Sequence, residues 1–455
     1  MKQKTLRITA CLLALVMLLF SFVSCNMKGK TLLSLKKDGV SVSFSVNLYE
    51  FLLSRSKGLL HSSGATQNGA TAAQAAFWDY QDKFDGTTFQ TFDEFYSQSV
   101  LNTCKVNLIA EYLFKREGLK LTEEQKDSIQ KIMDELIRTD GDGSKNKLNA
   151  VLGTYGVNYD LLKDFYTLEL KIKVLKNHLY GANASSIGDN YKTEFMNTYY
   201  VRFRQIYIST KPIVYLTDTA DDVIYFHTEE GQSNRIYYDD ANGETKLLED
   251  GSLATDSNGD TVYYVKGTDY TRIAYNIVQG EPKPKTDTNG ETVVRDLTDE
   301  ELEEVTNRVN ALLEQAQNAA TDEEFEKLLV KESEGDTDVS EYNDGIYLRT
   351  DLDYALMGED QAYLATIVSK LKTMQDDDVC LVPSPTGYHI IRKYNNAEKA
   401  YANAANESYF ENFYENVINQ CFLDECEKYA DAVKINEKVL AKAPSMKTVG
   451  INYFY

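Results

Sequence analysis

Helical periodicity dominates the first part of the chain. Capping boxes of the Thr-x-x-Glu/Gln type predict helices that begin after Thr91 and after Thr122, the first of them ending before Gly118. A further helix is predicted after Asn158, where apolar residues recur at spacings of four and three. One continuous apolar face results, made by Leu161, Phe165, Leu168, Ile172, Leu175 and Leu179. We interpret this face as packing within a helical core.

Ahead of these helices the pattern is that of a hairpin. Apolar and polar residues alternate on both sides of Lys37-Asp38-Gly39, which predicts a short linker and a hairpin over residues 26–44. A helix is expected from about Leu48. The Gly, Ser, Ala and Thr residues of segment 62–73 predict a loop after it.

Strand-like runs return later in the chain. Val201–Ile208 and Val382–Ile391 are rich in β-branched and aromatic residues, and we interpret both as strands, the second introduced by a proline-rich turn. Between them, Thr298 and Thr321 open two capped helices, and residues 362–372 predict a third. The closing part of the chain is again expected to be helical, from 397 to 432.

Residues 213–297 contain three copies of a sequence motif, Asp-x-Asn-Gly-Glu/Asp-Thr, which begin at Asp240, Asp256 and Asp287. Asn-Gly accepts the positive φ of a tight turn, and strand-like residues flank the first two copies, so hairpin turns are predicted. A calcium site is the alternative interpretation, although an EF-type loop places its glycine sixth and here it is fourth. We expect a β-rich insertion.

The N-terminus predicts export. Three basic residues precede an apolar run over residues 8–23, which has the length of a signal peptide and is short for a membrane span. Ser24 and Cys25 close the run in the manner of a bacterial lipobox, with Phe22 where leucine is usual. We therefore expect residues 1–24 to be removed and Cys25 to be lipidated. An ordinary cleaved signal with an incidental cysteine is the alternative.

Composition limits the remaining possibilities. With 455 residues, 43% of them apolar and only 6 prolines, the chain is expected to form two to four globular domains. Its net charge of −22 would repel phosphate backbones, which argues against nucleic acid as a partner. Apart from Cys11 in the leader and Cys25, the cysteines have no zinc-like spacing, and buried thiols are expected, with a structural disulfide as the alternative. They are Cys104, Cys380, Cys421 and Cys426.

Several sequence segments resemble segments of the parvulin-type peptidyl-prolyl isomerases. Val201–Ile208 resembles their first strand, Thr321–Leu329 their second helix, Asp338–Gly345 the loop before a Gly-Gly-Asp strand, and Gly387–Ile391 their last strand. Residues 30–195 resemble the helical domain of SurA-type chaperones. The order of these segments is similar to that of PrsA/SurA-type foldases.

The resemblance implies an α+β fold: a helical chaperone module built from both chain ends, and a parvulin-like α/β domain with a β-rich insertion. The expected domains are a signal peptide over 1–24, a helical domain over 25–197, a parvulin-like domain over 198–396 that contains insertion 213–297, and a C-terminal helix and tail over 397–455 that pack on the helical domain.

The resemblance also implies a site. Rotation about an X-Pro bond needs an apolar pocket and a polar network around a twisted amide, with no nucleophile, metal or cofactor. His389 matches the second of the family's two histidines, and Asp338 matches its Asp or Cys. Gln205 stands where the first histidine would be; it can donate and accept hydrogen bonds but cannot share a titrating proton. Met357 and Tyr363 are the pocket candidates.

The expected function is that of a foldase anchored by its lipid at the extracytoplasmic face of the bacterial cell membrane, whose partners are unfolded or partly folded secreted proteins. One alternative is a holdase whose parvulin-like domain only binds; another is a solute-binding or adhesive lipoprotein. His389 alone would also fit a core histidine with satisfied hydrogen bonds. The other histidines have no metal-ligand spacing, and no Gly-x-Ser-x-Gly or P-loop phrase is present.

Overall fold

The computed structural model describes residues 29–84, 86–217, 236–238, 254–255, 261–262, 283–284, 286–334, 344–352, 354 and 362–453. The chain divides into two compact units: unit 1 holds the described residues up to Phe195 and from Asn412, and unit 2 holds the residues between, apart from 351–353. Helices and small sheets occur in the chain together, so the expected α+β class is confirmed. The C-terminal boundary that we expected at 397 falls at 412.

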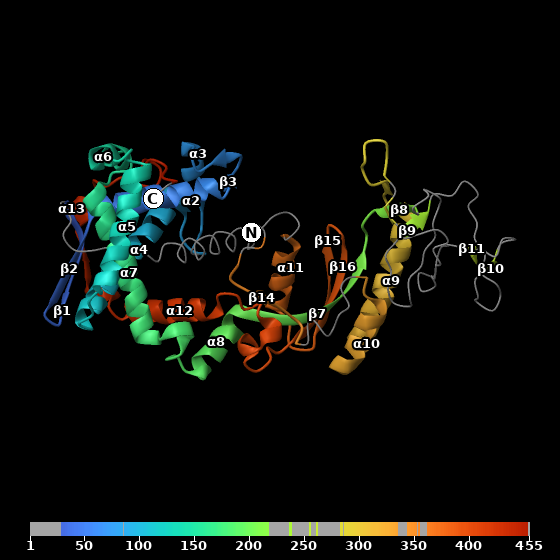
Figure 1. Ribbon diagram of the computed structural model, residues 1–455. Helices are drawn as coiled ribbons and strands as arrows, with labels where there is room; N and C mark the ends of the chain where they lie inside the picture. The colour runs from blue at the N-terminus through green and yellow to red at the C-terminus, as the bar shows by residue number, and fades with distance from the viewer. Residues whose placement is uncertain are drawn as a thin grey trace. The chain divides into compact units, whose positions relative to one another are not determined.

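A three-stranded antiparallel sheet in unit 1 joins segments from both ends of the chain (Figure 1). Strand β1 lies in the middle, between β2 and β17. The predicted turn is present, with Asp38 at φ 49° and Gly39 at φ 78°. The strands are β1 (Thr31–Lys37), β2 (Val40–Ser45) and β17 (Val433–Ile435).

The helices of unit 1 begin where their caps predict. Thr91 and Thr122 both form complete capping boxes, and the side chain of Asn158 accepts a hydrogen bond from the N–H of Leu161. Helix α8 contains the boundary with unit 2. The helices are α2 (Val46–Ser62), α3 (Ala75–Trp78), α4 (Phe92–Arg116), α5 (Glu123–Thr139), α6 (Lys145–Gly153), α7 (Tyr159–Tyr180), α8 (Asp189–Tyr199), α12 (Phe413–Glu427) and α13 (Glu437–Leu440).

Two sequence expectations are corrected, the first of them in unit 1. Segment 62–73 is not a plain loop, because β3 (Thr66–Gln67) and β4 (Ala70–Thr71) form a small hairpin. Its turn is Asn68-Gly69, at φ 50° and 79°. A second hairpin pairs β5 (Gln81–Asp82) with β6 (Gln90–Thr91).

The second correction concerns the segment after 397, which is not one helix. Residues 400–402 and 404–406 form short 3₁₀ turns, and α12 begins only at Phe413. Lys399 at φ 53° and Asn412 at φ 61° are left-handed, a conformation that a right-handed helix cannot contain.

The predicted apolar face of α7 is buried in the core of unit 1, with Phe165 and Leu175 both 0% exposed. Helix α4 crosses the same core and carries a buried carboxylate, Glu111, whose side chain is 2% exposed. Lys171 of α7 donates two hydrogen bonds to it, at 2.9 and 3.0 Å. Loss of Lys171 would leave this buried carboxylate with Lys115 alone, 3.4 Å away, so the pair with Lys171 helps to fix α4 against α7.

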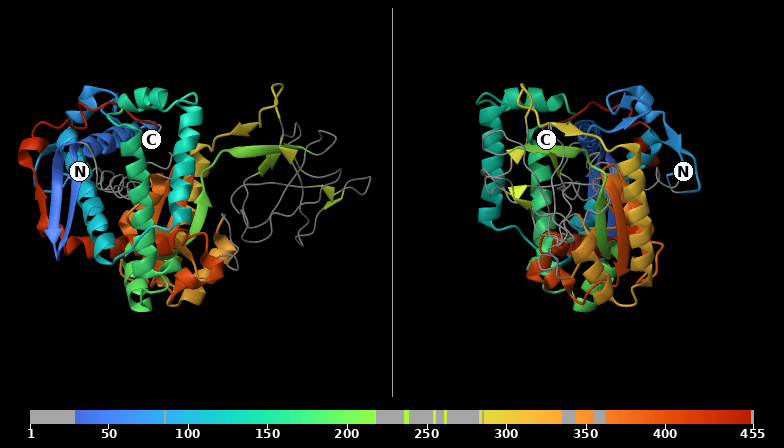
Figure 2. Two further views of the ribbon diagram at one scale, coloured as in Figure 1. Left: turned by 60° about the vertical axis from the view of Figure 1, so that its left-hand side comes forward. Right: turned by 90° about the vertical axis from the view of Figure 1, so that its right-hand side faces the viewer.

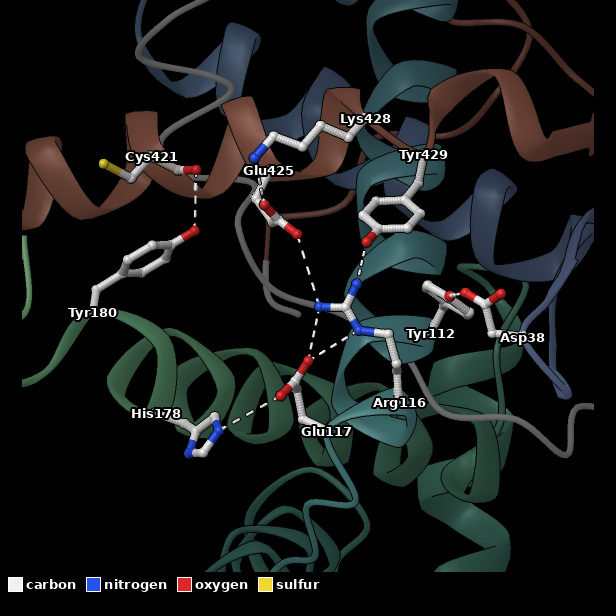
Figure 3. Close-up of polar contacts among 10 residues, drawn as sticks. All are labelled: Asp38, Tyr112, Arg116, Glu117, His178, Tyr180, Cys421, Glu425, Lys428 and Tyr429. Atoms are coloured by element: carbon white, nitrogen blue, oxygen red, sulfur yellow. Dashed lines mark hydrogen bonds and ion pairs between the residues drawn. The ribbon is translucent and has the colours of Figure 1, made fainter.

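Figure 3 shows a second polar cluster in unit 1, where the end of α4 meets C-terminal residues. The Arg116 guanidinium donates to Glu117 Oε1 at 2.7 and 2.9 Å and to the hydroxyl of Tyr429, and it lies 3.8 Å from Glu425. His178 Nε2 approaches Glu117 at 3.8 Å. These groups belong to α4, α7, α12 and the segment after it, so the cluster joins N-terminal and C-terminal helices within one unit.

The sheet of unit 2 is antiparallel and has the order β14-β7-β16-β15. The stretch that we predicted as one strand, 382–391, is a hairpin: Val382 lies in β15, a turn follows, and β16 begins at Gly387. Pro383 is tolerated in β15 because that strand lies at the sheet edge. The strands are β7 (Tyr200–Ser209), β14 (Ile346–Arg349), β15 (Val379–Ser384) and β16 (Gly387–Tyr394).

Helices cover both faces of this sheet. Helices α9 (Asp299–Asn318) and α10 (Asp322–Glu332) pack on one face, and α9 lies along β15 and β16 (Figure 2). Helix α11 (Ala362–Leu371) packs on the other face. Thr298 forms the complete capping box that its sequence predicts. Strand side chains alternate between faces, so Phe203 faces α11 whereas Ile206 faces α9 and α10.

One of the three repeated motifs in insertion 213–297 is described, and it is a tight turn. The N–H of Asp287 donates to the carbonyl of Glu291 at 2.8 Å, and Gly290 has φ 85°. The hairpin prediction is therefore confirmed for this copy; the turns of the other two, at 240–243 and 256–259, lie outside the described residues. The strands are β8 (Ile213–Thr217), β9 (Ile236–Tyr238), β10 (Ala254–Thr255), β11 (Thr261–Val262), β12 (Lys283–Pro284) and β13 (Val294–Arg295).

Candidate functional site

Strands β7 and β16 bring the sequence-predicted residues together. In their antiparallel register Tyr207 lies opposite His389, and Gln205 lies opposite Ile391. Alternation along each strand therefore places Gln205, Tyr207 and His389 on the face that α11 covers. Gly387 makes this register possible, because a Cβ at that position would lie 2.2 Å from the carbonyl oxygen of Ile208.

The imidazole of His389 is buried and neutral. Its residue is 4% exposed, and burial lowers the pKa of the ring to about 4. Nδ1 lies 3.0 Å from Oε1 of Gln205, which can only accept, so Nδ1 carries the proton and donates it. Nε2 then presents a bare lone pair, and none of the residues described in the structure donates to it. The site thus holds a hydrogen-bond acceptor in a fixed orientation.

Two tyrosines flank this imidazole. Tyr363 of α11 stacks on the ring, with centroids 4.9 Å apart and an interplanar angle of 14°. Tyr207 lies 5.0 Å away at 41°, and its hydroxyl donates to the carbonyl of Thr386 at 2.6 Å. Burial, with a smaller contribution from Tyr207, raises the pKa of Tyr363. The two rings exclude solvent from the imidazole, and this burial favours its neutral form.

The outer edge of β7 beside the site is occupied by the residues that follow α10. The N–H of Tyr207 donates to Ser333 Oγ at 3.0 Å, and its carbonyl accepts from the N–H of Glu334 at 2.7 Å. Glu334 Oε2 accepts from the N–H of Ser209 at 2.8 Å, and the same carboxylate pairs with Arg308. These contacts fix the chain immediately before the segment that contains Asp338.

The structure thus brings together three of the predicted site residues, Gln205, His389 and Tyr363. Asp338 and Met357 lie outside the described residues, as does Cys25. Sequence reasoning did not identify Tyr207, although its position two residues after Gln205 on a strand was a usable signal.

Other chemistry has little support in the described part of the chain. No cluster of three or more His, Cys, Asp or Glu side chains there is placed to hold a metal ion. The four described cysteines are free thiols, so the structural disulfide kept as an alternative does not form among them. Cys104 and Cys426 are buried, and burial raises the pKa of both thiols. No described helix combines the length and apolar character needed to cross a bilayer.

Comparisons with known proteins add little to this geometry. No family model matches the chain, and no curated protein is similar enough to match it. A solved structure that is similar is the crystal structure of PrsA from Bacillus subtilis, with 14% sequence identity over 78% of this chain and 90% of that chain. The TM-score is 0.18, a value that carries no argument about function.

Proposed function

We propose that this protein is an extracytoplasmic foldase whose unit 2 binds X-Pro segments of unfolded secreted proteins and accelerates their cis–trans isomerisation. The observation that carries the proposal is the contact between His389 Nδ1 and Gln205 Oε1 at 3.0 Å, beneath the stacked ring of Tyr363. A polar pair against aromatic rings is what a twisted amide beside a proline ring requires.

Each residue of the site has a separate role in this proposal. The Gln205 amide nitrogen, oriented by the bond that its oxygen accepts from His389, donates to the carbonyl of the rotating bond. Nε2 of His389 accepts from a substrate N–H. Tyr207 and Tyr363 supply the apolar surface for the proline ring. Because His389 is 4% exposed, the Tyr363 ring has to rotate aside when substrate enters.

The test is the isomerisation rate of a set of X-Pro peptides with the soluble mature chain. His389→Ala is expected to remove the acceleration, because both the acceptor and the group that orients Gln205 are lost. His178→Ala is the matched control, since that histidine lies in unit 1 with a side chain 48% exposed. Equal acceleration by both variants would exclude a role for His389.

A second candidate is a holdase whose unit 2 binds without catalysis. Gln205 in place of a second histidine, together with the burial of His389, favours it. The expected result would be suppression of client aggregation with no acceleration for any peptide, and with a binding constant that changes in His389→Ala.

The cellular location rests on the N-terminal sequence. The basic residues, the apolar run over 8–23 and Cys25 support export and lipid anchoring at the outer face of the cell membrane. Cys25→Ser should move the protein from the membrane fraction to the soluble extracytoplasmic fraction.

A further inference from the structure

The segment Ser445–Tyr453 lies in unit 1 against one side of α2. The α2 residues that contact it recur at helical spacings of three, four and seven, so they form a single stripe. This stripe is Ser54, Lys57, Gly58 and His61. The first turns of α4 contribute Asp93 and Ser97.

A buried lysine binds the backbone of this segment. The ammonium of Lys57 donates to the carbonyls of Lys447, at 3.1 Å, and Val449, at 2.8 Å. Lys57 is 5% exposed, and burial lowers its pKa. The N–H of Lys447 donates to Asp93 Oδ1 at 2.7 Å. A buried cation and a carboxylate thus bind carbonyl and N–H groups that every polypeptide carries.

Two further contacts are also to the main chain, whereas His61 and Asp79 contact side chains of the segment, those of Tyr453 and Lys447. The N–H of Met446 donates to Ser97 Oγ at 3.0 Å, and the N–H of Asn452 donates to the carbonyl of Ser54 at 3.0 Å. A Cβ on Gly58 would lie 1.9 Å from the carbonyl oxygen of Asn452, so only glycine lets the segment approach α2 this closely.

Two residues of the segment are themselves buried, Met446 and Asn452. Met446 is the apolar anchor, 0% exposed, and methionine is a side chain that adapts readily to irregular pockets. Lys447, Thr448 and Gly450 are exposed. Recognition through main-chain groups with one apolar anchor is a mode by which proteins bind peptides of varied sequence.

We propose that the stripe on α2 and the first turns of α4 form a polypeptide-binding site, which the chain's own segment Ser445–Tyr453 occupies until an unfolded protein displaces it. The ligand is a short segment of unfolded polypeptide that carries one large flexible apolar residue. This inference rests on the proposed foldase function and names a client site distinct from the one at His389.

The experiment releases the segment after folding. A recognition site for a specific protease is inserted between Lys442 and Ala443 in the full mature chain, and the folded protein is then cut. The probe is a fluorescent peptide with the sequence of residues 443–455. Cut protein should bind it saturably, and uncut protein at least tenfold more weakly, because the tethered segment competes at an effective concentration of about 1 mM. A reduced, carboxymethylated protein that stays unfolded should displace the peptide.

Variants test the proposed contacts. Lys57→Met should weaken peptide binding by about 10- to 100-fold, because two carbonyls lose a charged donor. Lys447→Met in the probe peptide should change its affinity for cut protein less than about threefold, since that ammonium pairs with Asp79 at the surface. If Lys57→Met does not fold, a probe peptide with Met446→Asp replaces it and should fail to bind unaltered cut protein.

Two results would overturn the inference: no exchange of the probe into cut protein, or binding that the unfolded protein does not displace. Isomerisation of X-Pro peptides is measured on the same samples. Isomerisation without displacement contradicts this site alone, whereas displacement without isomerisation contradicts only the catalytic part of the proposed function.

Discussion

Both faces of the sheet in unit 2 are lined mainly by apolar side chains, and they differ in the polar groups that they bury. The face under α9 and α10 is lined by aliphatic and aromatic side chains, and its two buried guanidiniums are paired: Arg204 with Glu326 at 3.1 Å, and Arg392 with Asp322 and Asp377. The face under α11 carries His389, which has one nitrogen without a partner among the described residues.

The two faces of one sheet therefore differ in the role of their buried polar groups. On the face under α10 the buried charges are compensated by carboxylates, although Arg392 Nε and the Tyr394 hydroxyl have no hydrogen-bond partner among the described residues. An unpaired buried acceptor such as Nε2 of His389 costs stability and persists where function needs it.

The largest expected effect comes from the face under α10. Phe325→Ala removes a ring that is 0% exposed and should lower the free energy of unfolding by about 3–5 kcal/mol, measured by denaturant titration. Tyr363→Ala, on the face under α11, is the control and should cost less because Tyr363 is only partly buried. The isomerisation rate per folded molecule should be unchanged in Phe325→Ala. A fall in that rate in proportion to the lost stability would show that the face under α10 also contributes to isomerisation.

The next effect is a pH dependence that belongs to His389. Its pKa is about 4 in the folded chain and about 6.5 when unfolded, so the unfolded state binds the extra proton between these values. The contribution of the neutral ring is complete above pH 6.5 and is lost as the pH falls toward 4, by about 3 kcal/mol at the lower limit. Denaturant titrations of the native chain and His389→Gln should therefore diverge below pH 6.5. Parallel profiles would show that the imidazole is not desolvated.

The smallest expected effect concerns Gln205. Gln205→Leu leaves the Nδ1–H of His389 without its acceptor and should lower the free energy of unfolding by about 1–3 kcal/mol. Gln205→Glu retains an acceptor, so it should cost less and should raise the pKa of His389, which histidine NMR titration measures. Equal stability of the two variants would mean that this hydrogen bond contributes nothing.

Local signals in the sequence predicted much of the fold. Capping boxes at Thr91, Thr122 and Thr298 located three helix starts, because a cap is satisfied by residues three positions apart. Prediction failed where left-handed residues interrupt a composition that favours helix: Lys399 precedes the 3₁₀ turns of unit 2, and Asn412 separates those turns from α12.

The candidate site was predicted in part for a similar reason. Gln205 and His389 could be anticipated in one site, since both lie on runs that were expected to be strands of the same domain; their hydrogen bond follows from the register of β7 and β16. The stacking of Tyr363 and the edge formed by Ser333 and Glu334 depend on tertiary packing between segments distant in sequence, which no local pattern specifies.

The three-stranded sheet of unit 1 also constrains when the protein can finish folding. Leu33 of β1 pairs with Ile435 of β17, so nearly the whole chain has to be synthesised before that sheet is complete. Unit 2 lies between these strands in sequence and contains all the strands of its own sheet. In a chain that leaves the ribosome or a translocation channel from its N-terminus, the sheet of unit 2 can form first. Until β17 emerges, the edge of β1 that pairs with it stays unpaired. The chain would itself remain incompletely folded until its last strand emerged.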